Sequence, residues 1–343
     1  MRGLLFLCVL VSGIGLSSSA RAHHSFAEYD ATKTIEVSGT LTEVTWQNPH
    51  VRLKVQAMEA GRMVTWDLEC HSVGILSRTN VNPKALKVGD KVTVAGNPSR
   101  ARPQRMFVTN VLTPAGELVM DHRTVPRWRK DADGTGPALL ASSNAQAPAG
   151  LFHVWSSNLS DPTAGPFALW SGDMKLTDAA KKALAKWDEV HDTIARDCVP
   201  KGMPTIMEQP YGMAFEDHGK TIVLRIEEYD TVRTIHLSDG VTVPAAKSLL
   251  GHSVGAWEGA TLVVTTTGIS WPYIAPNGLP QGPTSRMVER FTPSTDSKRL
   301  EYSVTITDPD TFMTPAVLKR AWVWTPGERV QKYSCGSRRA DGA

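Results

Sequence analysis

The sequence lacks a surplus of charge of either sign. Lysine and arginine total 37, and aspartate and glutamate total 34, which gives a formal net charge of +3 at neutral pH. Proteins that bind nucleic acid or an anionic membrane surface through electrostatics carry a clear excess of basic residues. The near balance therefore argues against both classes of partner, and a small molecule is the partner that we expect.

Several catalytic motifs are also absent. The chain contains no Gly-rich phosphate-binding loop, no H-E-x-x-H sequence and no C-x-x-C pair. These motifs accompany nucleotide binding, zinc proteolysis and redox or zinc chemistry, respectively. Their absence argues against these chemistries, and no stretch of the sequence identifies a reaction.

The one long apolar run is too short to span a bilayer. This run covers residues 4–16, follows a basic residue and precedes the small-x-small sequence Ala20-Arg21-Ala22. A membrane-spanning helix needs about 20 apolar residues, so the pattern predicts a cleavable signal peptide over residues 1–22. We therefore expect export, a mature chain that starts at His23 and no membrane anchor after cleavage. Cleavage after Ala20 would instead leave Arg21 as the first residue.

Cysteine is scarce. Of the four cysteines, Cys8 leaves with the predicted signal peptide, so Cys70, Cys198 and Cys335 remain. An oxidising compartment permits disulfides, and this odd number allows one internal bridge. We expect Cys198 to pair with Cys335, because that bridge would join the end of a predicted helix to the last predicted strand. Cys70 is then a buried free thiol; a bridge that includes Cys70 is the alternative.

The first half of the mature chain has the pattern of short strands. Apolar residues alternate with polar ones in five segments, and a short helix is expected between the third and fourth, at residues 72–77. This order is typical of an OB-like five-stranded barrel, to which we assign residues 23–120. Residues 121–150 mix charge, Pro, Gly, Ala and Ser without a period, which indicates a linker.

The second half, residues 151–343, combines one long predicted helix with a run of strands. Apolar residues form one stripe along residues 177–198, with Thr177 as the N-cap. About nine predicted strands follow, separated by turn sequences that contain Gly, Pro or Asp. A meander of this length closes into a lipocalin-like antiparallel barrel or folds into a sandwich, because open edges invite aggregation. The chain is therefore predicted to be mainly β, and a barrel of this size can hold one small ligand.

Short motifs in both halves resemble known families. His23-His24-Ser25-Phe26, Trp46-Gln47-Asn48-Pro49-His50 and the segment LKVGDKVTVAG at residues 86–96 look like an exported proteobacterial family of unknown function. This resemblance covers about residues 23–120 and implies a Gram-negative periplasmic setting without an activity. The second half resembles uncharacterised proteins from the same bacteria, through residues 198–204, 257–264 and 308–309.

The predicted mature amino terminus offers one candidate metal site. With His23 as the first residue, its amine and imidazole can chelate a metal ion, and His24 adds a second imidazole. Nitrogen-rich tetragonal sites suit Cu(II), and His50, in the predicted loop between the first two strands, could complete the site. The alternative is a hydrophilic start of the mature chain together with an unrelated surface loop.

The predicted strand pair at residues 221–237 carries the candidate ligand-binding groups. Arg225 and Glu227 share one face of the first strand, and Arg233 or His236 on the next strand can lie beside Arg225. If this face points into a barrel, the arginines can bind a carboxylate while Glu227 and His236 move protons. If it points outward, the same residues form cross-strand salt bridges of little energetic weight, and alternation alone does not decide between the two.

These observations support three functional hypotheses. The leading one is a periplasmic protein that binds a small molecule in its second domain without turnover, because a long meander occurs without a recognisable catalytic set. The second is a cofactor-free lyase, isomerase or hydrolase centred on Glu227 and His236. The third is copper binding through His23, His24 and His50. The sequence does not choose among them and gives no oligomeric state.

Overall fold

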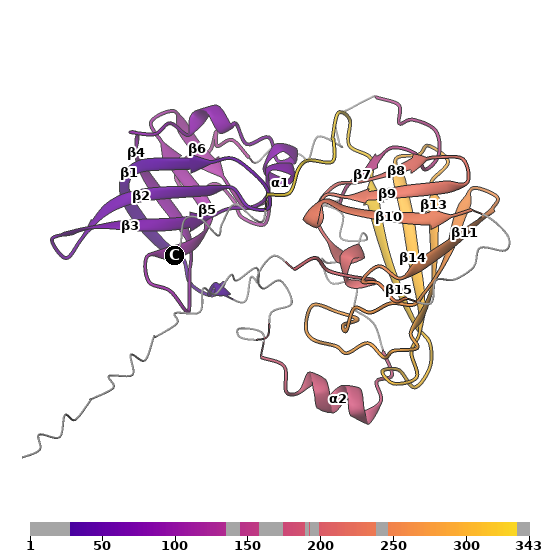
Figure 1. Ribbon diagram of the computed structural model, residues 1–343. Coiled ribbons are helices and arrows are strands. Elements are labelled where there is room, and N and C mark those ends of the chain that lie inside the picture. The colour runs from indigo at the N-terminus through magenta and orange to yellow at the C-terminus, as the bar shows by residue number, and fades with distance from the viewer. Residues whose placement is uncertain are drawn as a thin grey trace, which may run out of the picture.

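A computed structural model places the chain in two β-barrels that lie side by side (Figure 1). The structure describes residues 28–134, 145–157, 174–188, 192, 199–237 and 246–334. Strands dominate both barrels and the helices are short, which confirms the predicted mainly-β fold class. Among the described helices, none has the length and hydrophobicity needed to cross a membrane.

The first barrel contains one short α-helix and six strands. Helix α1 (Val73–Arg78) lies between the third and fourth of these strands, which are β1 (Ile35–Thr45), β2 (Arg52–Glu59), β3 (Arg62–Glu69), β4 (Lys91–Pro98), β5 (Arg105–Thr113) and β6 (Gly116–Val119). The sheet order is β3-β2-β1-β4-β5-β6, and a parallel pairing of β3 with β5 closes the barrel. This closure and the place of α1 confirm the predicted OB-like architecture, to which β6 is an addition.

Alternating side chains form the core of the first barrel. On β2, Leu53, Val55 and Ala57 are buried, and the residues between them are more exposed. Gly39 on β1 permits a close approach of two backbones, because a Cβ at this position would lie 2.2 Å from the Gln56 carbonyl oxygen. The glycine therefore lets β1 bend across β2 and coil around the barrel.

The second barrel is formed by nine strands in one sheet, with the order β15-β14-β13-β12-β11-β10-β9-β8-β7. Ser156, next to β7, exchanges two backbone hydrogen bonds of 2.8 Å with Val323 on β15, so the barrel is nearly closed. The strands are β7 (Val154–Trp155), β8 (Met213–Asp217), β9 (Thr221–Ile226), β10 (Thr231–His236), β11 (His252–Glu258), β12 (Thr261–Thr267), β13 (Arg286–Pro293), β14 (Arg299–Thr307) and β15 (Ala316–Val323).

One strand pairing departs from the predicted antiparallel meander. β10 pairs with β11 in parallel, with Ile235 opposite Ser253, whereas the other neighbouring pairs of this sheet are antiparallel. The parallel pairing joins the last two residues of β10 to the start of β11, and residues 237–251 separate the two strands. Parallel neighbours need such a long connection, whereas the predicted meander assumed tight turns.

The predicted helix over residues 177–198 is shorter in the structure. α2 spans Asp178–Leu184, and the Thr177 side chain caps it as predicted. At Trp187 the chain is no longer helical, and the indole ring packs directly on Gly278, where no side chain intervenes. This tertiary contact redirects the chain, and most of the remaining predicted helix lies outside the described residues.

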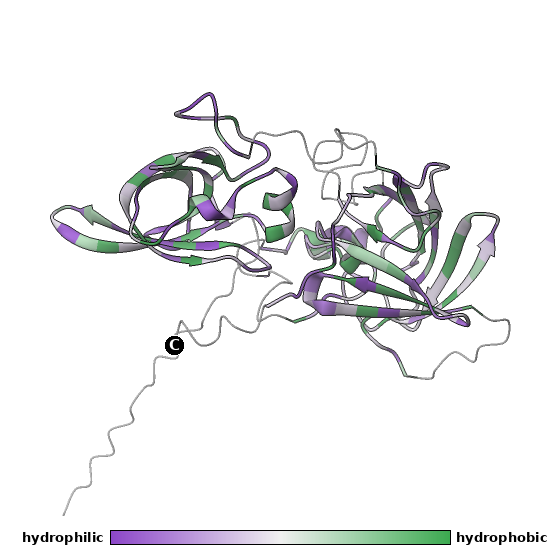
Figure 2. Ribbon diagram, turned by 90° about the horizontal axis from the view of Figure 1, so that it is seen from above, coloured by the Kyte–Doolittle hydropathy of each residue, from purple (hydrophilic) through white to green (hydrophobic). Residues whose placement is uncertain are grey.

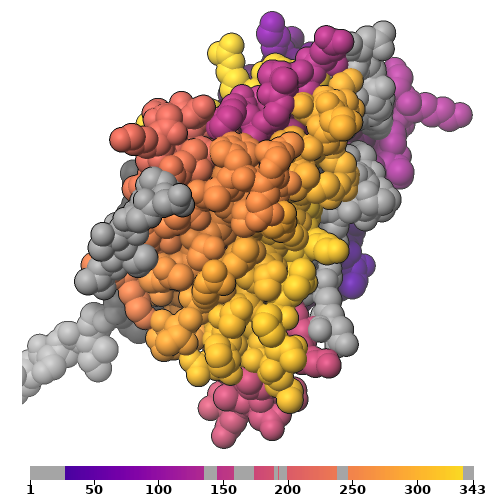
Figure 3. Space-filling view, turned by 90° about the vertical axis from the view of Figure 1, so that its right-hand side faces the viewer, coloured from indigo at the N-terminus to yellow at the C-terminus, as the bar shows by residue number. Residues whose placement is uncertain are grey.

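Side chains fill the interior of the second barrel. Hydrophobic and hydrophilic residues alternate along its strands (Figure 2), and atoms coloured orange to yellow cover much of one face of the molecule (Figure 3). A barrel packed in this way holds polar side chains only where they find partners. Its large buried residues include Trp155, Phe215, Leu224, Phe291, Tyr302 and Trp322.

Candidate functional site

The loop between β1 and β2 joins the two barrels. Asn48 in this loop donates a hydrogen bond from Nδ2 to Glu227 Oε1 of the second barrel (2.7 Å). Its Oδ1 accepts a hydrogen bond from the Val73 amide at the start of α1 (3.0 Å). The Asn48 backbone forms a single parallel bridge with Tyr333. These contacts fix the buried Asn48 amide between the barrels.

Helix α1 lies on the side of the first barrel that faces the second barrel (Figure 1), and it contributes a buried arginine to the same junction. Arg78 donates hydrogen bonds from Nη1 to the Ser157 carbonyl (2.8 Å) and from Nη2 to the Pro210 carbonyl (3.3 Å). Its Nη1 also lies 3.8 Å from Glu328 Oε1. Burial lowers the pKa of Arg78, and the charges of Glu328 and Glu227 oppose this effect. A guanidinium starts from so high a pKa that Arg78 remains a cation at neutral pH.

Glu227 is the carboxyl group at the centre of the junction. It follows β9 and accepts a hydrogen bond at Oε2 from the Gln331 amide (2.9 Å). Burial raises the pKa of Glu227 to about 7; Glu328 adds to this rise, while the Gln331 and Asn48 hydrogen bonds and the Arg78 charge oppose it. The carboxyl group therefore exchanges its proton near neutral pH, a property common among functional carboxyl groups.

Two further cations lie at this end of the second barrel, the buried Arg320 and the partly buried Lys201. Lys201 Nζ forms an ion pair with Glu228 Oε1 (2.7 Å). Arg320 donates a hydrogen bond to Ser157 Oγ and lies 5.1 Å from the Trp322 ring centroid. Burial lowers the pKa of Arg320 to about 10. Each buried charge has a desolvation cost of several kcal/mol before pairing, so their concentration here weighs against a purely structural role.

Tyrosine rings form one wall of the junction. Tyr211 and Tyr229 both pack against Tyr333, with ring centroids 5.5 Å and 5.0 Å from it. Burial raises the pKa of Tyr211 and Tyr333 far above the usual value, so both rings keep their hydroxyl protons at neutral pH. The wall is thus aromatic and uncharged.

Buried polar atoms without a hydrogen-bond partner gather at the junction. Among the described residues, the unpartnered atoms include two nitrogen donors, one hydroxyl and two carboxylate oxygens: Arg78 Nε, Gln209 Nε2, Thr325 Oγ1, Glu228 Oε2 and Glu328 Oε2. They come from both barrels. Buried polar atoms nearly always have a partner, so each such atom needs an explanation. Both donors and acceptors are therefore left without a hydrogen-bond partner here.

The four predicted ligand-binding residues do not meet. Arg225 lies on the outer face of β9, where it pairs with a glutamate of β8 (2.7 Å). Arg233 on β10 points into the barrel, and His236 ends that strand, stacked on another histidine ring at 5.0 Å. Glu227 lies beyond the opposite end of the β9–β10 hairpin. His236 lies opposite Thr221, six residues along the strand from Glu227. At 3.4 Å per residue the two are about 20 Å apart, so they cannot act as one acid–base pair.

Arg233 is held by partners from the protein itself. Its Nη1 donates a hydrogen bond to Glu289 Oε1 (3.0 Å), and its Nη2 pairs with the other oxygen of the same carboxylate. Nη2 also donates to Thr266 Oγ1 (2.8 Å), and Nε donates to Ser253 Oγ (3.1 Å). The Tyr302 hydroxyl donates to Glu289 Oε1 (3.0 Å). Arg233 therefore neutralises a buried glutamate rather than presenting its charge to a ligand.

One motif carries no catalytic serine in this fold. The sequence Gly251-His252-Ser253-Val254-Gly255 matches the G-x-S-x-G pattern of serine hydrolases. In those enzymes the serine lies exposed on a sharp turn between a strand and a helix. Ser253 instead lies within β11, is 2% exposed and holds Arg233. It is a structural hydroxyl inside the barrel.

The predicted copper and disulfide residues are only partly described. His50 Nδ1 lies 2.9 Å from the Cys70 carbonyl and 3.6 Å from Glu69 Oε1. Cys70 is free and buried, as predicted, and burial raises the pKa of its thiol. The copper site and the disulfide remain predictions, because the other residues lie outside the described part of the chain: His23, His24, Cys198 and Cys335.

A surface groove of about 570 Å³ crosses β1, β2 and β4 on the first barrel. Polar side chains along it already form pairs. Lys91 Nζ donates to Thr40 Oγ1 (2.7 Å), and the hydroxyls of Ser38 and Thr93 lie 2.9 Å apart. These two pairs occupy four of the polar side chains that line the groove.

Comparisons with known proteins reach only the first half of the chain. A family of unknown function, DUF6152, matches residues 11–105, which include most of the first barrel. No curated protein and no solved structure matches the chain. The match agrees with the predicted resemblance of the first half to a family without a known activity. Asn48 and Arg78 fall inside the matched region.

Proposed function

We propose that the protein binds a small polar molecule at the junction of its two barrels and does not transform it. The observation that carries this proposal is the set of buried, unpartnered donors and acceptors at the junction. The first barrel contributes Arg78 Nε, and the second barrel contributes Gln209, Glu228, Thr325 and Glu328. A bound molecule with complementary groups would satisfy atoms that otherwise carry a desolvation cost.

The charges of the junction favour a ligand without strong net charge. Lys201 is paired with Glu228, and Arg78 lies near Glu328. Glu227, with its pKa of about 7, is roughly half ionised at neutral pH. Because the opposing charges nearly balance, a neutral or zwitterionic molecule that carries both donors and acceptors fits best, such as an amino acid or a polyol.

Binding without turnover is favoured over catalysis because the candidate catalytic groups among the described residues lie apart. Glu227 and His236 lie at opposite ends of their hairpin, and Ser253 is engaged inside the barrel. We place this binding function in the periplasm, in accord with the predicted signal peptide over residues 1–22. Intact-mass analysis of the exported protein should then show His23 as the first residue.

Thr325→Val tests the binding proposal. The variant removes a hydroxyl that has no protein partner, so the unbound protein should be as stable as wild type or slightly more stable. A panel of amino acids, hydroxy acids and polyols is screened by thermal shift, and hits are measured by calorimetry. Wild type should bind at least one class, and the variant should bind it about tenfold more weakly, as expected for one lost hydrogen bond.

Ser285→Ala is the matched control, because Ser285 Oγ is also buried and unpartnered but lies between β12 and β13, outside the junction. This variant should bind the ligand as tightly as wild type. The proposal fails if no class of molecule in the panel binds the wild-type protein. It also fails if Thr325→Val binds the ligand as tightly as the control Ser285→Ala does.

A further inference from the structure

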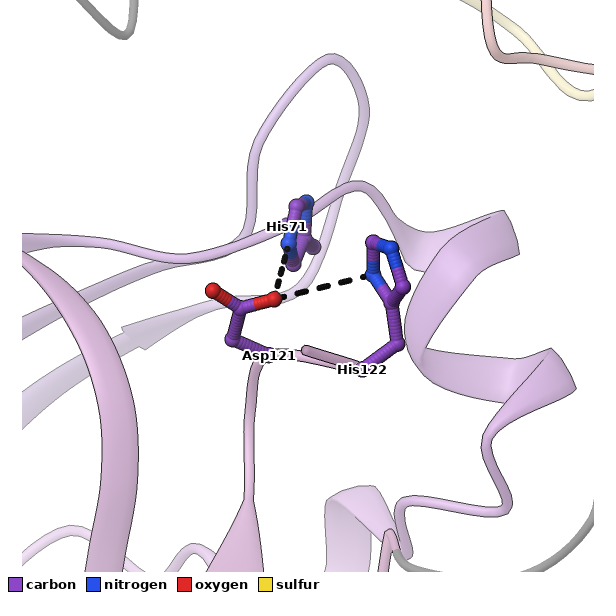
Figure 4. A group of neighbouring side chains, drawn as sticks. All are labelled: His71, Asp121 and His122. Carbon is purple, nitrogen blue, oxygen red and sulfur yellow. Dashed lines mark hydrogen bonds and ion pairs between the residues drawn. The ribbon is translucent and has the colours of Figure 1, made fainter. Parts of the chain in front are cut away.

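A cluster of metal-ligating side chains lies in the first barrel, apart from the residues used above. His71 follows β3, and Asp121 and His122 follow β6 (Figure 4). His71 Nε2 lies 3.2 Å from Asp121 Oδ1, and His122 Nδ1 lies 3.6 Å from the same oxygen. One ligand atom from each residue falls within 4.8 Å of the other two. The two strand ends therefore bring two imidazole nitrogens and one carboxylate oxygen together.

These separations match the edges of a metal coordination shell. Ligand atoms at about 2.05 Å from a tetrahedral zinc ion are about 3.3 Å from one another. The observed 3.2 Å and 3.6 Å lie on either side of this value. The first distance is also longer than a usual hydrogen bond to a carboxylate, about 2.8 Å. A metal ion can thus enter with small side-chain movements.

The rings are held in place by packing. His71 is 3% exposed and meets Phe107 edge-on, with ring centroids 5.0 Å apart. The His71 and His122 rings lie 5.2 Å apart and are tilted by 46°. His122 is less buried than the other two residues, so the cluster has an approach from its side. A site of this kind is preorganised on one side and accessible on the other.

Arg123 supplies the competing structural interpretation. Its backbone amide and its Nε both donate to Asp121 Oδ1 (3.0 Å each), and its Nη2 donates to Oδ2 (2.9 Å). This arrangement would also serve as a clamp on the loop after β6. The Arg123 side chain is 53% exposed, however, so it can leave Oδ1 for solvent or remain on Oδ2. Carboxylates that bind metals commonly keep such outer hydrogen bonds.

We propose that His71, Asp121 and His122 form a binding site for a divalent transition-metal ion, with Zn(II) as the cation they suit best. Two imidazoles and one carboxylate are a zinc ligand set that leaves one coordination position open. This set is poorer in nitrogen than the copper site predicted at the amino terminus, and it uses none of its residues. The proposal does not depend on ligand binding at the junction.

Metal titration of the full chain tests the site. The background carries His23→Ala and His24→Ala, so that a terminal chelate cannot contribute. One equivalent of Zn(II) should bind by calorimetry, and Co(II) should give the strong visible absorption of four-coordinate cobalt. His122→Ala should weaken Zn(II) binding at least tenfold and abolish the cobalt spectrum. His218→Ala is the control, because exposed His218 also has a carboxylate neighbour (3.3 Å) and should change neither result.

A second measurement needs no variant at the site. Zn(II) should protect His122 in the same background from modification by diethylpyrocarbonate, as read by peptide mass, and should leave the reactivity of His218 unchanged. The proposal is overturned if no equivalent binds, if His122→Ala binds Zn(II) as tightly as its parent, or if the metal protects both histidines equally. Any of these results would leave the Arg123 clamp as the explanation of the cluster.

Discussion

Arg225 and Arg233 show how one residue type acquires opposite roles within a single hairpin. Arg225 on β9 is half exposed and pairs with Glu216 at the surface. Arg233 on β10 is 1% exposed and pairs with the fully buried Glu289. An exposed ion pair contributes about 0–1 kcal/mol, whereas breaking a buried pair costs about 3–5 kcal/mol because one charge stays buried alone.

Glu289→Gln should therefore destabilise the protein by about 3–5 kcal/mol, because it leaves the Arg233 charge without its counter-ion. Arg225→Ala, on the same hairpin, should cost less than about 1 kcal/mol. Urea denaturation, followed by tryptophan fluorescence, measures both free energies of unfolding. Equal effects of the two substitutions would contradict this account of the barrel interior.

At the scale of elements, two glycines test whether backbone contact shapes the first barrel. A Cβ on Gly39 would meet the Gln56 carbonyl of β2 at 2.2 Å, where the backbone cannot give way without breaking the sheet. A Cβ on Gly74, in α1, would meet only Glu328 Oε1 at an ordinary 3.8 Å. Gly39→Ala should lower the free energy of unfolding by about 2 kcal/mol or more. Gly74→Ala should leave it unchanged or raise it by up to about 1 kcal/mol.

Both variants are compared by thermal and urea unfolding monitored by circular dichroism. A Gly39 variant as stable as wild type would show that β1 and β2 do not approach as closely as described. A large loss in the Gly74 variant would show that α1 packs more tightly against the second barrel than its contacts indicate.

The elements themselves follow from local pattern, which is why the sequence predicts them well. Alternation along β2 and β12 reports burial on one face, and Thr177 has the chemistry of a helix cap. The sequence does not reveal which face of the β9–β10 hairpin is inside. Glu227 is an example. β9 ends at Ile226, so Glu227 lies in the turn, where alternation between the two faces of a strand no longer predicts the direction of a side chain.

The candidate site was harder to predict, because it depends on contacts between distant residues. Asn48 and Glu227 are 179 positions apart in the chain and meet only after both barrels have formed. The motif at residues 46–50 was the available signal, yet it pointed to a metal role for His50 rather than to docking by Asn48. Arg78 carried no local signal, because a basic residue at the end of a helix normally faces solvent.

For the whole molecule, Glu227 makes the stability of the junction depend on pH. The folded state raises its pKa from 4.5 to about 7. Below pH 4.5 Glu227 is protonated in both the folded and the unfolded state, so it does not change the free energy of unfolding with pH. Between pH 4.5 and pH 7 the unfolded chain loses this proton while the folded protein keeps it. The free energy of unfolding therefore falls by about 3 kcal/mol over this range. Burial lowers the pKa of His122 to about 4, so the contribution of His122 to the free energy of unfolding rises as the pH increases from 4 to 6.5.

Glu227→Gln isolates this contribution, because the His122 slope is common to both proteins. The stability of wild type minus that of the variant should fall between pH 4.5 and pH 7 and level off above pH 7.5. Urea denaturation across this range measures the difference. A flat difference would mean that Glu227 is ionised in the folded protein and that the junction is better solvated than its burial indicates.

The Asn48 side chain is expected to contribute, together with Arg78, to the coupling of the two barrels in unfolding. Its side chain bonds both Glu227 and the first amide of α1, so Asn48→Ala removes one hydrogen bond across the junction and one within the first barrel. The loss should be about 2 kcal/mol, and calorimetry should show the second barrel unfolding separately from the first. Asn97→Ala, which removes an exposed hydrogen bond to the Lys33 carbonyl (2.7 Å), should cost less than about 1 kcal/mol and keep the wild-type calorimetric profile.

Asn48→Asp separates docking from local helix support. The new carboxylate can still accept the Val73 amide of α1, but it faces Glu227 in place of a donor. At pH 6 Glu227 is largely protonated and can donate a hydrogen bond to it, whereas at pH 8 the two negative charges repel each other. The variant should therefore retain coupled unfolding at pH 6 and lose it at pH 8, while the first barrel stays equally stable. If the coupling is lost at both pH values, the amide donor of Asn48, and not the charge of Glu227, holds the barrels together.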